Sequence, residues 1–272
     1  MSILPRPLLE QLVDDAAMFP PGNASAPAAL SAHLRYRREW FSWLVGPLLI
    51  HADRWPEFVD AHTDIGAPAV DVVVIGATAR PDPTPVSVRV VGFEVAVPHP
   101  PLPQTSSGIP LAAEVTAGEE GAEVLGEISR SRAAGVRVIG KYRTGGVVAE
   151  AFPDEQQLAT VLDTALTRGA PLKLTAGLHH AVRRTDATTG FEQHGFLNVM
   201  VVVSRWLRDL GGGSLEDALA TRDPAPLVDE VHTWSHDHVA AVRRGFVSFG
   251  CCGVEDPVND LLALGLIDKE NT

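Results

Sequence analysis

The chain has 272 residues, of which 45% are hydrophobic and 21% are charged, a composition typical of a globular protein that can bury a large core. Its 34 acidic residues outnumber its 22 lysines and arginines, which gives a formal net charge of −12 at pH 7. Nucleic acids and anionic membranes both favour basic surfaces, so this charge argues against them as partners, although it does not exclude a small anionic substrate in a local cationic pocket.

Several features predict a cytoplasmic protein. The apolar run at 196–203 is too short to span a membrane, and Asn198 interrupts it. Glu10, Asp14 and Asp15 interrupt the apolar core that a signal peptide needs. The two cysteines are adjacent, so they do not form a disulfide framework. The sequence leaves a homo-oligomer open.

Residues 1–43 predict a helical lead-in that packs on the main domain. The stretch RPLLEQLVDDAAMFPPGN reads as helical and stops at the Pro-Pro-Gly that follows Phe19, and a second helical stretch follows at 27–43. Asp14 and Asp15 stand before this rigid turn. They are expected either to cap a helix or to fold over a site as part of a lid.

From residue 44 onward, short segments rich in valine, isoleucine and leucine recur, as buried parallel strands do. The expected strands are 44–51, 70–76, 88–96, 110–116, 136–143, 171–178 and 245–250. One more segment, HGFLNVM at 194–200, is ambiguous, because the stretch FLNVMVVVSRWLRDLGGG is also consistent with one long helix.

Amphipathic helices are expected between several of these strands. The stretches at 116–135 and 154–169 have apolar residues at helical spacing, and each joins two successive strands. Segments 77–87 and 97–109 are rich in proline, threonine and serine, so helices are expected to be missing after the second and third strands. The alternation predicts an α/β fold, a (β/α)8 (TIM-like) barrel formed as one domain by residues 44–272. A doubly wound open sheet is the structural alternative.

The stretch PLKLTAGLHH at 171–180 has one apolar face and one cationic face, because its leucines alternate with Lys173 and His179. Lys141 and Arg143 alternate with apolar residues in VRVIGKYR in the same way. Burying an unpaired lysine under a layer of helices is costly. We therefore expect both charged faces to point into the mouth of the barrel, where active sites of this fold lie.

Carboxylates on two preceding strands are expected to meet these cations. Glu114 lies in IPLAAEV, and Glu94 lies in VGFEVAV. So many ionisable groups at the ends of neighbouring strands exceed what packing requires and indicate a functional site. The alternative is an ion pair that only fills the barrel. The candidate catalytic residues are Lys173, Lys141, Glu114 and His179.

Two turns after strands predict the binding of an anionic group. The turn Arg143-Thr144-Gly145-Gly146 exposes backbone N–H groups beside a guanidinium, which suits a carboxylate or phosphate. The last strand runs into Gly250-Cys251-Cys252-Gly253 before a helix, and either thiol is a nucleophile or a small buried group. The candidate substrate-binding residues are Arg143, Gly145, Gly146, Asn198, Gly250, Cys251, Cys252 and Gly253.

The histidines offer an alternative metal site. His179, His180 and His194 flank the loop AVRRTDATTGFEQ and, together with Glu114, are a potential ligand set for a divalent ion. The stretch HTWSHDH at 232–238 has the spacing that places two ligands on one helix face. Taken singly, each histidine is more commonly a solvent-exposed or hydrogen-bonded core residue.

Four stretches, DDAAMFPPGN, GKYRTGG, KLTAGLHH and HGFLN, together resemble an uncharacterised bacterial protein family, and this resemblance spans essentially the whole chain. It implies relatedness and no mechanism. The lysines on neighbouring late strands are also similar to those of some class I aldolases. The sequence signatures of those enzymes are absent, so this likeness is an analogy of fold alone.

The leading hypothesis is an enzyme that acts on a small carboxylated or phosphorylated metabolite, either by lyase or aldolase-like cleavage or by proton transfer next to a carbonyl. Lys173 or Lys141 is expected to form a Schiff base or act as a general base. Glu114 or His179 is expected to move protons, and Arg143 to hold the anionic group. No cofactor is required.

Two other classes of function remain open. The first is a metal-dependent hydrolase or lyase, in which His179, His180 or His194 binds a divalent metal with Glu114 and Lys141 acts as an electrostatic clamp. The second is a non-catalytic barrel that binds a ligand, because polar strand ends serve equally well as a binding pocket.

Overall fold

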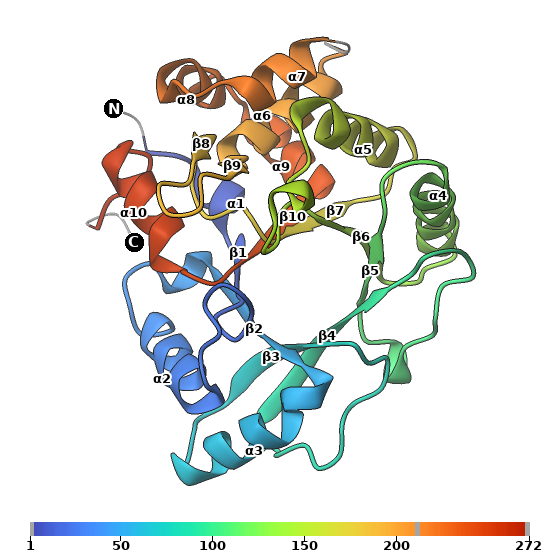
Figure 1. The fold of residues 1–272 in the computed structure, drawn as a ribbon, viewed down its shortest axis with the longest axis vertical. Helices are drawn as coiled ribbons and strands as arrows, with labels where there is room; N and C mark the ends of the chain where they lie inside the picture. The colour runs from blue at the N-terminus through green and yellow to red at the C-terminus, as the bar shows by residue number, and fades with distance from the viewer. Residues whose placement is uncertain (1–2, 210–212, 270–272) are drawn as a thin grey trace.

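Eight parallel strands close into a barrel in the computed structural model, which describes residues 3–209 and 213–269 (Figure 1). Each strand pairs with two neighbours that run in the same direction, so the barrel has no free edge. The expected (β/α)8 barrel is confirmed. In order around the barrel, the strands are β1 (Val13–Asp15), β10 (Phe246–Cys251), β7 (Leu172–Thr175), β6 (Val138–Arg143), β5 (Leu111–Val115), β4 (Val88–Ala96), β3 (Val70–Ile75) and β2 (Val45–His51).

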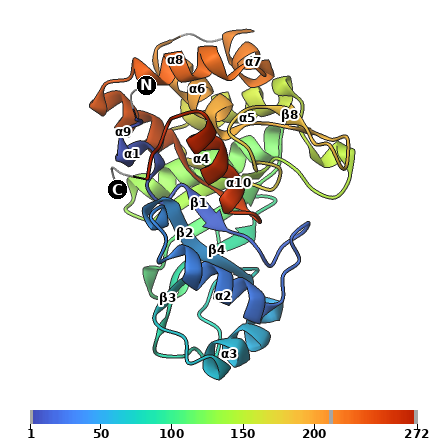
Figure 2. The same cartoon turned by 90° about the vertical axis from the view of Figure 1, so that its left-hand side faces the viewer.

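Helices surround this barrel, and α7 and α8 lie at the end of the molecule opposite α3 (Figures 1 and 2). None of the helices in the described part of the chain is long and apolar enough to cross a membrane. The α-helices are α1 (Arg6–Leu9), α2 (Ala26–Tyr36), α3 (Trp55–Asp64), α4 (Glu119–Ala133), α5 (Glu155–Thr167), α6 (Phe196–Leu207), α7 (Gly213–Ala220), α8 (Pro224–His232), α9 (His236–Gly245) and α10 (Glu255–Ala263).

The barrel is irregular where the sequence predicts it. Between β3 and β4 the described chain forms no helix, and between β4 and β5 it forms only the short 3₁₀ turn η3 (Ser106–Gly108). The other 3₁₀ turns are η1 (Ser42–Leu44), η2 (Ala52–Arg54) and η4 (Ala149–Ala151). Prolines prevent regular helix in both connections, because a proline lacks the N–H group that a helix needs. The expectation that helices are missing after these strands is confirmed.

The longest connection joins β7 to β10. It contains a small antiparallel hairpin, β8 (Arg184–Thr185) with β9 (Glu192–Gln193), and then the four helices from α6 to α9. The segment at 194–200 therefore begins a helix, and its assignment as a strand is wrong. The residues from Phe196 to Ser204 are all buried, because α6 contacts α5, α7, α8, α9 and β10. A segment buried on every side shows no period that separates helix from strand.

The eighth barrel strand comes instead from the first 43 residues. β1 fills the gap between β10 and β2, with Val13 opposite Phe249 on one side and Val45 on the other. The lead-in is therefore not a separate helical segment, and that part of the prediction is wrong. Three residues, two of them aspartates, are too few to show the alternation or apolar run by which strands are recognised.

Two apolar clusters stabilise the fold. The large cluster lies between the barrel and the helices and includes Phe58, Phe93 and Phe246. The small cluster consists of Ala16, Leu49 and Val73, with Phe19 and Ile75 packed against it. These residues come from β2, β3 and the loop after β1, so the small cluster fills one side of the barrel interior. The other side is charged.

The loops that follow β6 and β7 pack closely through two glycines. A Cβ atom on Gly177 would lie 2.5 Å from the carbonyl oxygen of Thr144, and one on Gly145 would lie 2.9 Å from Gly177 Cα. Thr144 also donates backbone and side-chain hydrogen bonds to Thr175 O, and the backbone distance is 2.8 Å. The two loops therefore form one rigid corner at the end of the barrel.

Replacing Gly177 with alanine should lower the free energy of unfolding by about 3 kcal/mol, because the substitution combines a left-handed backbone with overlap on Thr144. The matched control is Gly169→Ala. Gly169 has a similar φ of +67°, against +75° for Gly177, but has nothing within 4 Å of its added Cβ. This control should cost only about 1 kcal/mol. Urea denaturation measures both, and equal losses would show that the close approach of the loops does not matter.

Candidate active site

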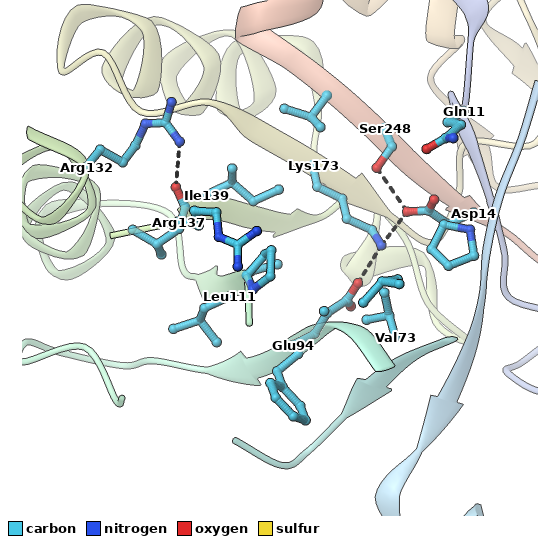
Figure 3. A pocket seen from close by; sticks show the side chains of 18 of the residues that line it. Gln11, Asp14, Val73, Glu94, Leu111, Arg132, Arg137, Ile139, Lys173 and Ser248 are labelled. Atoms are coloured by element: carbon cyan, nitrogen blue, oxygen red, sulfur yellow. Dashed lines mark hydrogen bonds and ion pairs between the residues drawn. The ribbon is translucent and has the colours of Figure 1, made fainter. Parts of the chain in front are cut away.

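Six side chains of alternating charge form a connected series inside the barrel, here called the ionic chain. Lys173 Nζ lies 2.6 Å from Asp14 Oδ2 and also bonds Glu94 Oε1 (Figure 3). Ser248 donates a hydrogen bond of 2.9 Å to the same Asp14 oxygen. Consecutive ion pairs in the series share a side chain, so the contacts are continuous. In order, the members are Asp14, Lys173, Glu94, Lys141, Glu114 and Arg143.

The second half of the ionic chain reaches the solvent. Lys141 Nζ lies 2.8 Å from Glu94 Oε2 and 2.9 Å from Glu114 Oε2. Arg143 Nε lies 3.4 Å from Glu114 Oε1, and the Arg143 side chain is 54% exposed. In contrast, the side chains of Glu94 and Lys141 are at most 3% exposed. The ionic chain thus runs from the buried interior of the barrel to the end of β6.

Strand register explains why these groups meet. Lys141 on β6 lies opposite Glu114 on β5 and opposite Lys173 on β7, and Lys173 lies opposite Ser248 on β10. Side chains at matched positions of neighbouring strands share one layer of a barrel. The sequence predicts that Lys173 lies beside Lys141 or meets Glu114, and the first of these is observed. The carboxylates that bind it are instead those of Asp14 and Glu94.

Electrostatics favour the charged forms at the centre of the chain. Burial alone would raise the pKa of Glu94, but the charges of Lys173 and Lys141 outweigh burial and hold this pKa at about 2. Burial alone would lower the pKa of Lys173, and the carboxylates of Asp14 and Glu94 outweigh it and raise that pKa. Lys173 is therefore a firmly protonated structural cation. The predicted Schiff-base role requires neutral amine, which this environment opposes.

The two outer carboxylates differ from Glu94. Burial raises the pKa of Asp14 and is only partly opposed by Lys173, because Asp14 has one lysine partner where Glu94 has two. Burial would also raise the pKa of Glu114, but Lys141 and Arg143 outweigh it and lower this pKa. A carboxylate with a lowered pKa is a weak base. Glu114 is thus better placed to orient the two cations than to remove a proton.

A cavity of about 280 Å³ lies at the C-terminal ends of the strands and is here called the mouth cavity. Lys141, Arg143, Thr175 and His179 all line it. A neighbouring cavity of about 400 Å³ shares His179 with it and extends toward Phe152 and α10. The structure therefore brings six of the predicted site residues to one hollow, while Lys173 lies below the layer that lines it. The six are Lys141, Arg143, Gly146, His179, Gly250 and Cys252.

The loop after β1 covers part of this mouth, and Phe19 and Pro20 line the mouth cavity. The two aspartates that precede it have separate roles. Asp14 joins the ionic chain, whereas Asp15 lies 3.0 Å from His33 Nδ1 of α2 and accepts a hydrogen bond from the backbone of Ala17. Neither aspartate caps a helix, because the N-caps of α1 and α2 are Pro5 and Ser25, and neither belongs to a lid, because both are buried. Sequence reasoning missed Asp14, whose one signal is an acidic residue directly after a short apolar run.

His179 lies at the rim of the mouth cavity beside the two cysteines. Its Nδ1 is 3.5 Å from Cys251 Sγ and 3.8 Å from Cys252 Sγ, and 4.0 Å from the carboxylate of Asp256. Burial lowers the pKa of His179, so the imidazole is neutral at pH 7. Burial raises the pKa of both thiols. The cysteines therefore lack the thiolate character that a nucleophile needs.

The other two histidines of the predicted metal site have structural partners. His180 lies 3.1 Å from Asp260 Oδ2, and His194 lies 2.8 Å from the carbonyl oxygen of Pro153 and 3.1 Å from Arg183. Within residues 3–209 and 213–269, no group of three or more His, Cys, Asp or Glu side chains is placed to hold a metal ion. The three histidines do not converge, so the geometry does not support the metal alternative.

Asn198 is a structural residue rather than part of the mouth. It is fully buried, its Oδ1 accepts a hydrogen bond of 2.9 Å from the backbone of Arg183, and its Nδ2 donates to Ala218 O and Thr221 O. These three bonds attach the start of α6 to the loop after β7 and to the end of α7. The assignment of Asn198 to substrate binding is wrong, because its amide is fully used.

The predicted glycines divide into two groups. Gly146 and Gly250 line the mouth cavity, as the sequence predicts. Gly145 instead packs against Gly177, and a Cβ on Gly253 would lie 2.5 Å from the carboxylate of Asp256. A carboxylate at that position repels an anion. Gly145 and Gly253 therefore shape the loops, and neither lines the mouth cavity.

Comparison of the chain with models of known protein families, with curated proteins and with solved structures gave no match. The fold and the positions of the described side chains are thus the basis for assigning a function. The resemblance to a bacterial family stays a prediction.

Replacing Glu94 with glutamine should destabilise the protein by about 3 kcal/mol at pH 7 and should have little effect near pH 2. The pKa of Glu94 is lowered from 4.5 to about 2 in the folded state. Its charge therefore stabilises the fold above pH 4.5, and this contribution is lost as the pH falls to about 2. Urea denaturation over this range measures the difference between the two proteins.

The control for this experiment is Asp71→Asn, because Asp71 pairs with Arg89 on the surface, where ion pairs contribute little. It should change stability by less than about 1 kcal/mol at any pH. A pH-independent effect of Glu94→Gln would contradict the assignment of Glu94 as the ionised centre of the chain.

Replacing Asn198 with alanine should lower the free energy of unfolding by about 3 kcal/mol, because it leaves buried groups of Arg183, Ala218 and Thr221 without a partner. Asn259→Ala, an exposed position on α10, should be nearly neutral. Ligand affinity of the folded Asn198→Ala variant should not change. Weaker ligand binding without a loss of stability would restore Asn198 to the substrate site.

Proposed function

We propose that the protein is an enzyme that binds a small carboxylated or phosphorylated metabolite in the mouth cavity and moves a proton next to its carbonyl group, as lyases and isomerases do. The observation that carries this proposal is that Arg143, Lys141 and His179 line one cavity. Enzymes with this fold have their active sites at the same end of the barrel. Two cations and a neutral base are the groups that such a reaction needs.

Arg143 is the group that binds the anionic end of the substrate. Its guanidinium has five N–H donors, and the contact with Glu114, at 3.4 Å, uses only one nitrogen. The side chain is 54% exposed at the end of β6, so a ligand reaches it without any movement of other side chains. Guanidinium groups bind carboxylates and phosphates through two parallel hydrogen bonds.

Lys141 is the group that stabilises the negative charge that develops on the carbonyl oxygen. Its ammonium has three N–H donors and forms ion pairs with Glu94 at 2.8 Å and Glu114 at 2.9 Å, so a ligand needs only one further donor. Lys141 lines the mouth cavity and can offer that donor to an oxygen of the ligand. Because both carboxylates hold the ammonium in place, it needs no rearrangement as the charge forms, which is the condition for efficient electrostatic catalysis.

His179 is the general base. Burial lowers its pKa, so it is neutral and able to accept a proton at pH 7. Its Nε2 forms no hydrogen bond with any described residue, while Nδ1 faces the cysteines and Asp256. This mechanism needs no Schiff base and no cofactor. It also agrees with the raised pKa of Lys173, which opposes covalent catalysis by that amine.

The proposal also covers the cellular compartment of the protein and its relation to the resembling family. The two free thiols of Cys251 and Cys252 suit a reducing compartment, so we place the enzyme in the cytoplasm. The stretches that resemble an uncharacterised bacterial family include Asp14, Lys141, Arg143, Lys173 and His179. We therefore infer that members of this family carry these four members of the ionic chain, Asp14, Lys141, Arg143 and Lys173, and the same histidine at the mouth.

The test measures exchange of carbon-bound hydrogen for deuterium by NMR in heavy water, with pyruvate and dihydroxyacetone phosphate as the carboxylated and phosphorylated probes. His179→Asn should slow exchange about a hundredfold or more. Arg143→Gln should raise KM about tenfold or more, because it removes a charged hydrogen-bond donor. The rate should fall as the pH drops below the lowered pKa of His179, where the base becomes protonated.

Arg89→Gln is the control, because this arginine near the start of β4 is exposed, pairs with Asp71 of β3 and does not line the mouth cavity. It should leave exchange unchanged. Exchange that persists in His179→Asn would exclude His179 as the base. Trapping of Lys141 or Lys173 by borohydride with either probe would favour the covalent alternative.

A further inference from the structure

A large cavity lies at the end of the barrel opposite the mouth. Its volume is about 830 Å³, and it is here called the basal cavity. Residues that begin the strands line it, among them Leu111 of β5, Val138 of β6 and Val247 of β10. It extends inward to Lys173, whose side chain points toward Asp14 and Glu94 (Figure 3). The ionic chain therefore meets a cavity at each end of the barrel. Lys141 and Arg143 line the one at the mouth, and Asp14, Glu94 and Lys173 line the basal one.

Three arginines line the basal cavity, and none of them pairs with a carboxylate among the described residues. Arg132 donates a 2.9 Å hydrogen bond to Val138 O, and Arg137 donates one of 2.6 Å to Gly108 O. Arg243 donates to two backbone carbonyls, at 3.2 Å and 3.1 Å. Each guanidinium has five donors, so most of them remain available. Backbone carbonyls hold these side chains in position without neutralising their charge.

The carboxylates that line the basal cavity do not cancel this charge. Asp14 and Glu94 are both bound to Lys173, and Glu10 has a side chain that is 54% exposed and lies 4.0 Å from Arg6. Burial lowers the pKa of Arg243 to about 10, which is the expected effect of a guanidinium without a full counter-charge. A cluster of uncompensated arginines is unexpected in a chain whose net charge is −12.

The remaining walls of the basal cavity are apolar. Val73, Pro110, Leu111, Ile139 and Val247 line it together with the arginines. A site with an apolar wall and a few polar groups suits a ligand that has both characters. The apolar part buries against these side chains, and the charged part meets the guanidinium groups.

We propose that the basal cavity is a second ligand site, for an organic anion in which a carboxylate or phosphate monoester is attached to an apolar body. Arg132, Arg137 and Arg243 bind the anionic group, and the third donor of Lys173 lies at the inner end of the cavity. The layer of the ionic chain separates this site from the mouth. The proposal does not depend on the catalytic role of Lys141 or His179.

Calorimetric titration with phenyl phosphate, benzoate and inorganic phosphate tests this site in the full chain. The Arg143→Gln variant serves as the background, because it weakens anion binding at the mouth. Phenyl phosphate or benzoate should bind with a stoichiometry of one in this background, and more tightly than inorganic phosphate. The organic probe that binds better identifies the anionic group. Adding Arg137→Gln should weaken that binding about tenfold or more.

Arg89→Gln, added to the same background, is the matched control and should leave the affinity unchanged, because Arg89 is exposed, paired with Asp71 and outside the basal cavity. Arg132→Gln and Arg137→Lys guard against a variant that fails to fold, and thermal melting checks each one. Arg132→Gln should weaken binding as Arg137→Gln does, and Arg137→Lys should retain part of the affinity. Absence of binding by both organic probes, or equal affinity in the Arg89, Arg132 and Arg137 variants, would overturn the proposal.

Discussion

The alternation of charge along the ionic chain is the constraint on which the rest of the barrel depends. Barrels of this type commonly fill their interior with layers of branched apolar side chains. Here five buried or half-buried ionised groups occupy one side of the interior, and the small apolar cluster around Leu49 occupies the other. Removing any one partner would leave a buried charge uncompensated, which costs far more than a surface ion pair contributes. The ionic chain therefore specifies the register of β1, β4, β5, β6 and β7 together.

This arrangement also divides the barrel into two ends with different chemistry. The mouth has one firmly held ammonium, one accessible guanidinium and a neutral imidazole, which together suit a reaction. The basal cavity has arginines that backbone carbonyls hold in place, and among the described residues no neutral proton acceptor lines it. It therefore suits the binding of a ligand. Lys141 and Lys173 lie side by side in the register, yet each faces a different cavity. A single ionic layer thus supports both sites and keeps them apart.

Single stretches of sequence serve several purposes in this fold. In PLKLTAGLHH, Lys173 belongs to the ionic chain, Gly177 closes the corner against Thr144, and His179 lines the mouth. His180, the next residue, binds Asp260 of α10 and so fixes the loop. In HGFLN, His194 and Asn198 are saturated by structural hydrogen bonds. Adjacent polar residues in such motifs are therefore not equivalent, and only part of each motif faces a ligand.

The local sequence pattern was sufficient to predict seven strands, the class of fold and the inward direction of Lys141 and Lys173. Both the alternation of apolar residues and the cost of burying an unpaired lysine act within a few residues. It was insufficient for β1, which is recognisable only by its pairing with Val45 and Phe249, and for α6, which is buried on every side. The sequence pattern also could not predict which charged side chains form ion pairs with one another. Which carboxylate meets Lys173 depends on strand order and stagger around a closed barrel. Asp14 lies 159 positions earlier in the sequence and reaches Lys173 only because the first and last strands join. Long-range closure, and not local preference, decided which charges neutralise one another and which remain available to a ligand.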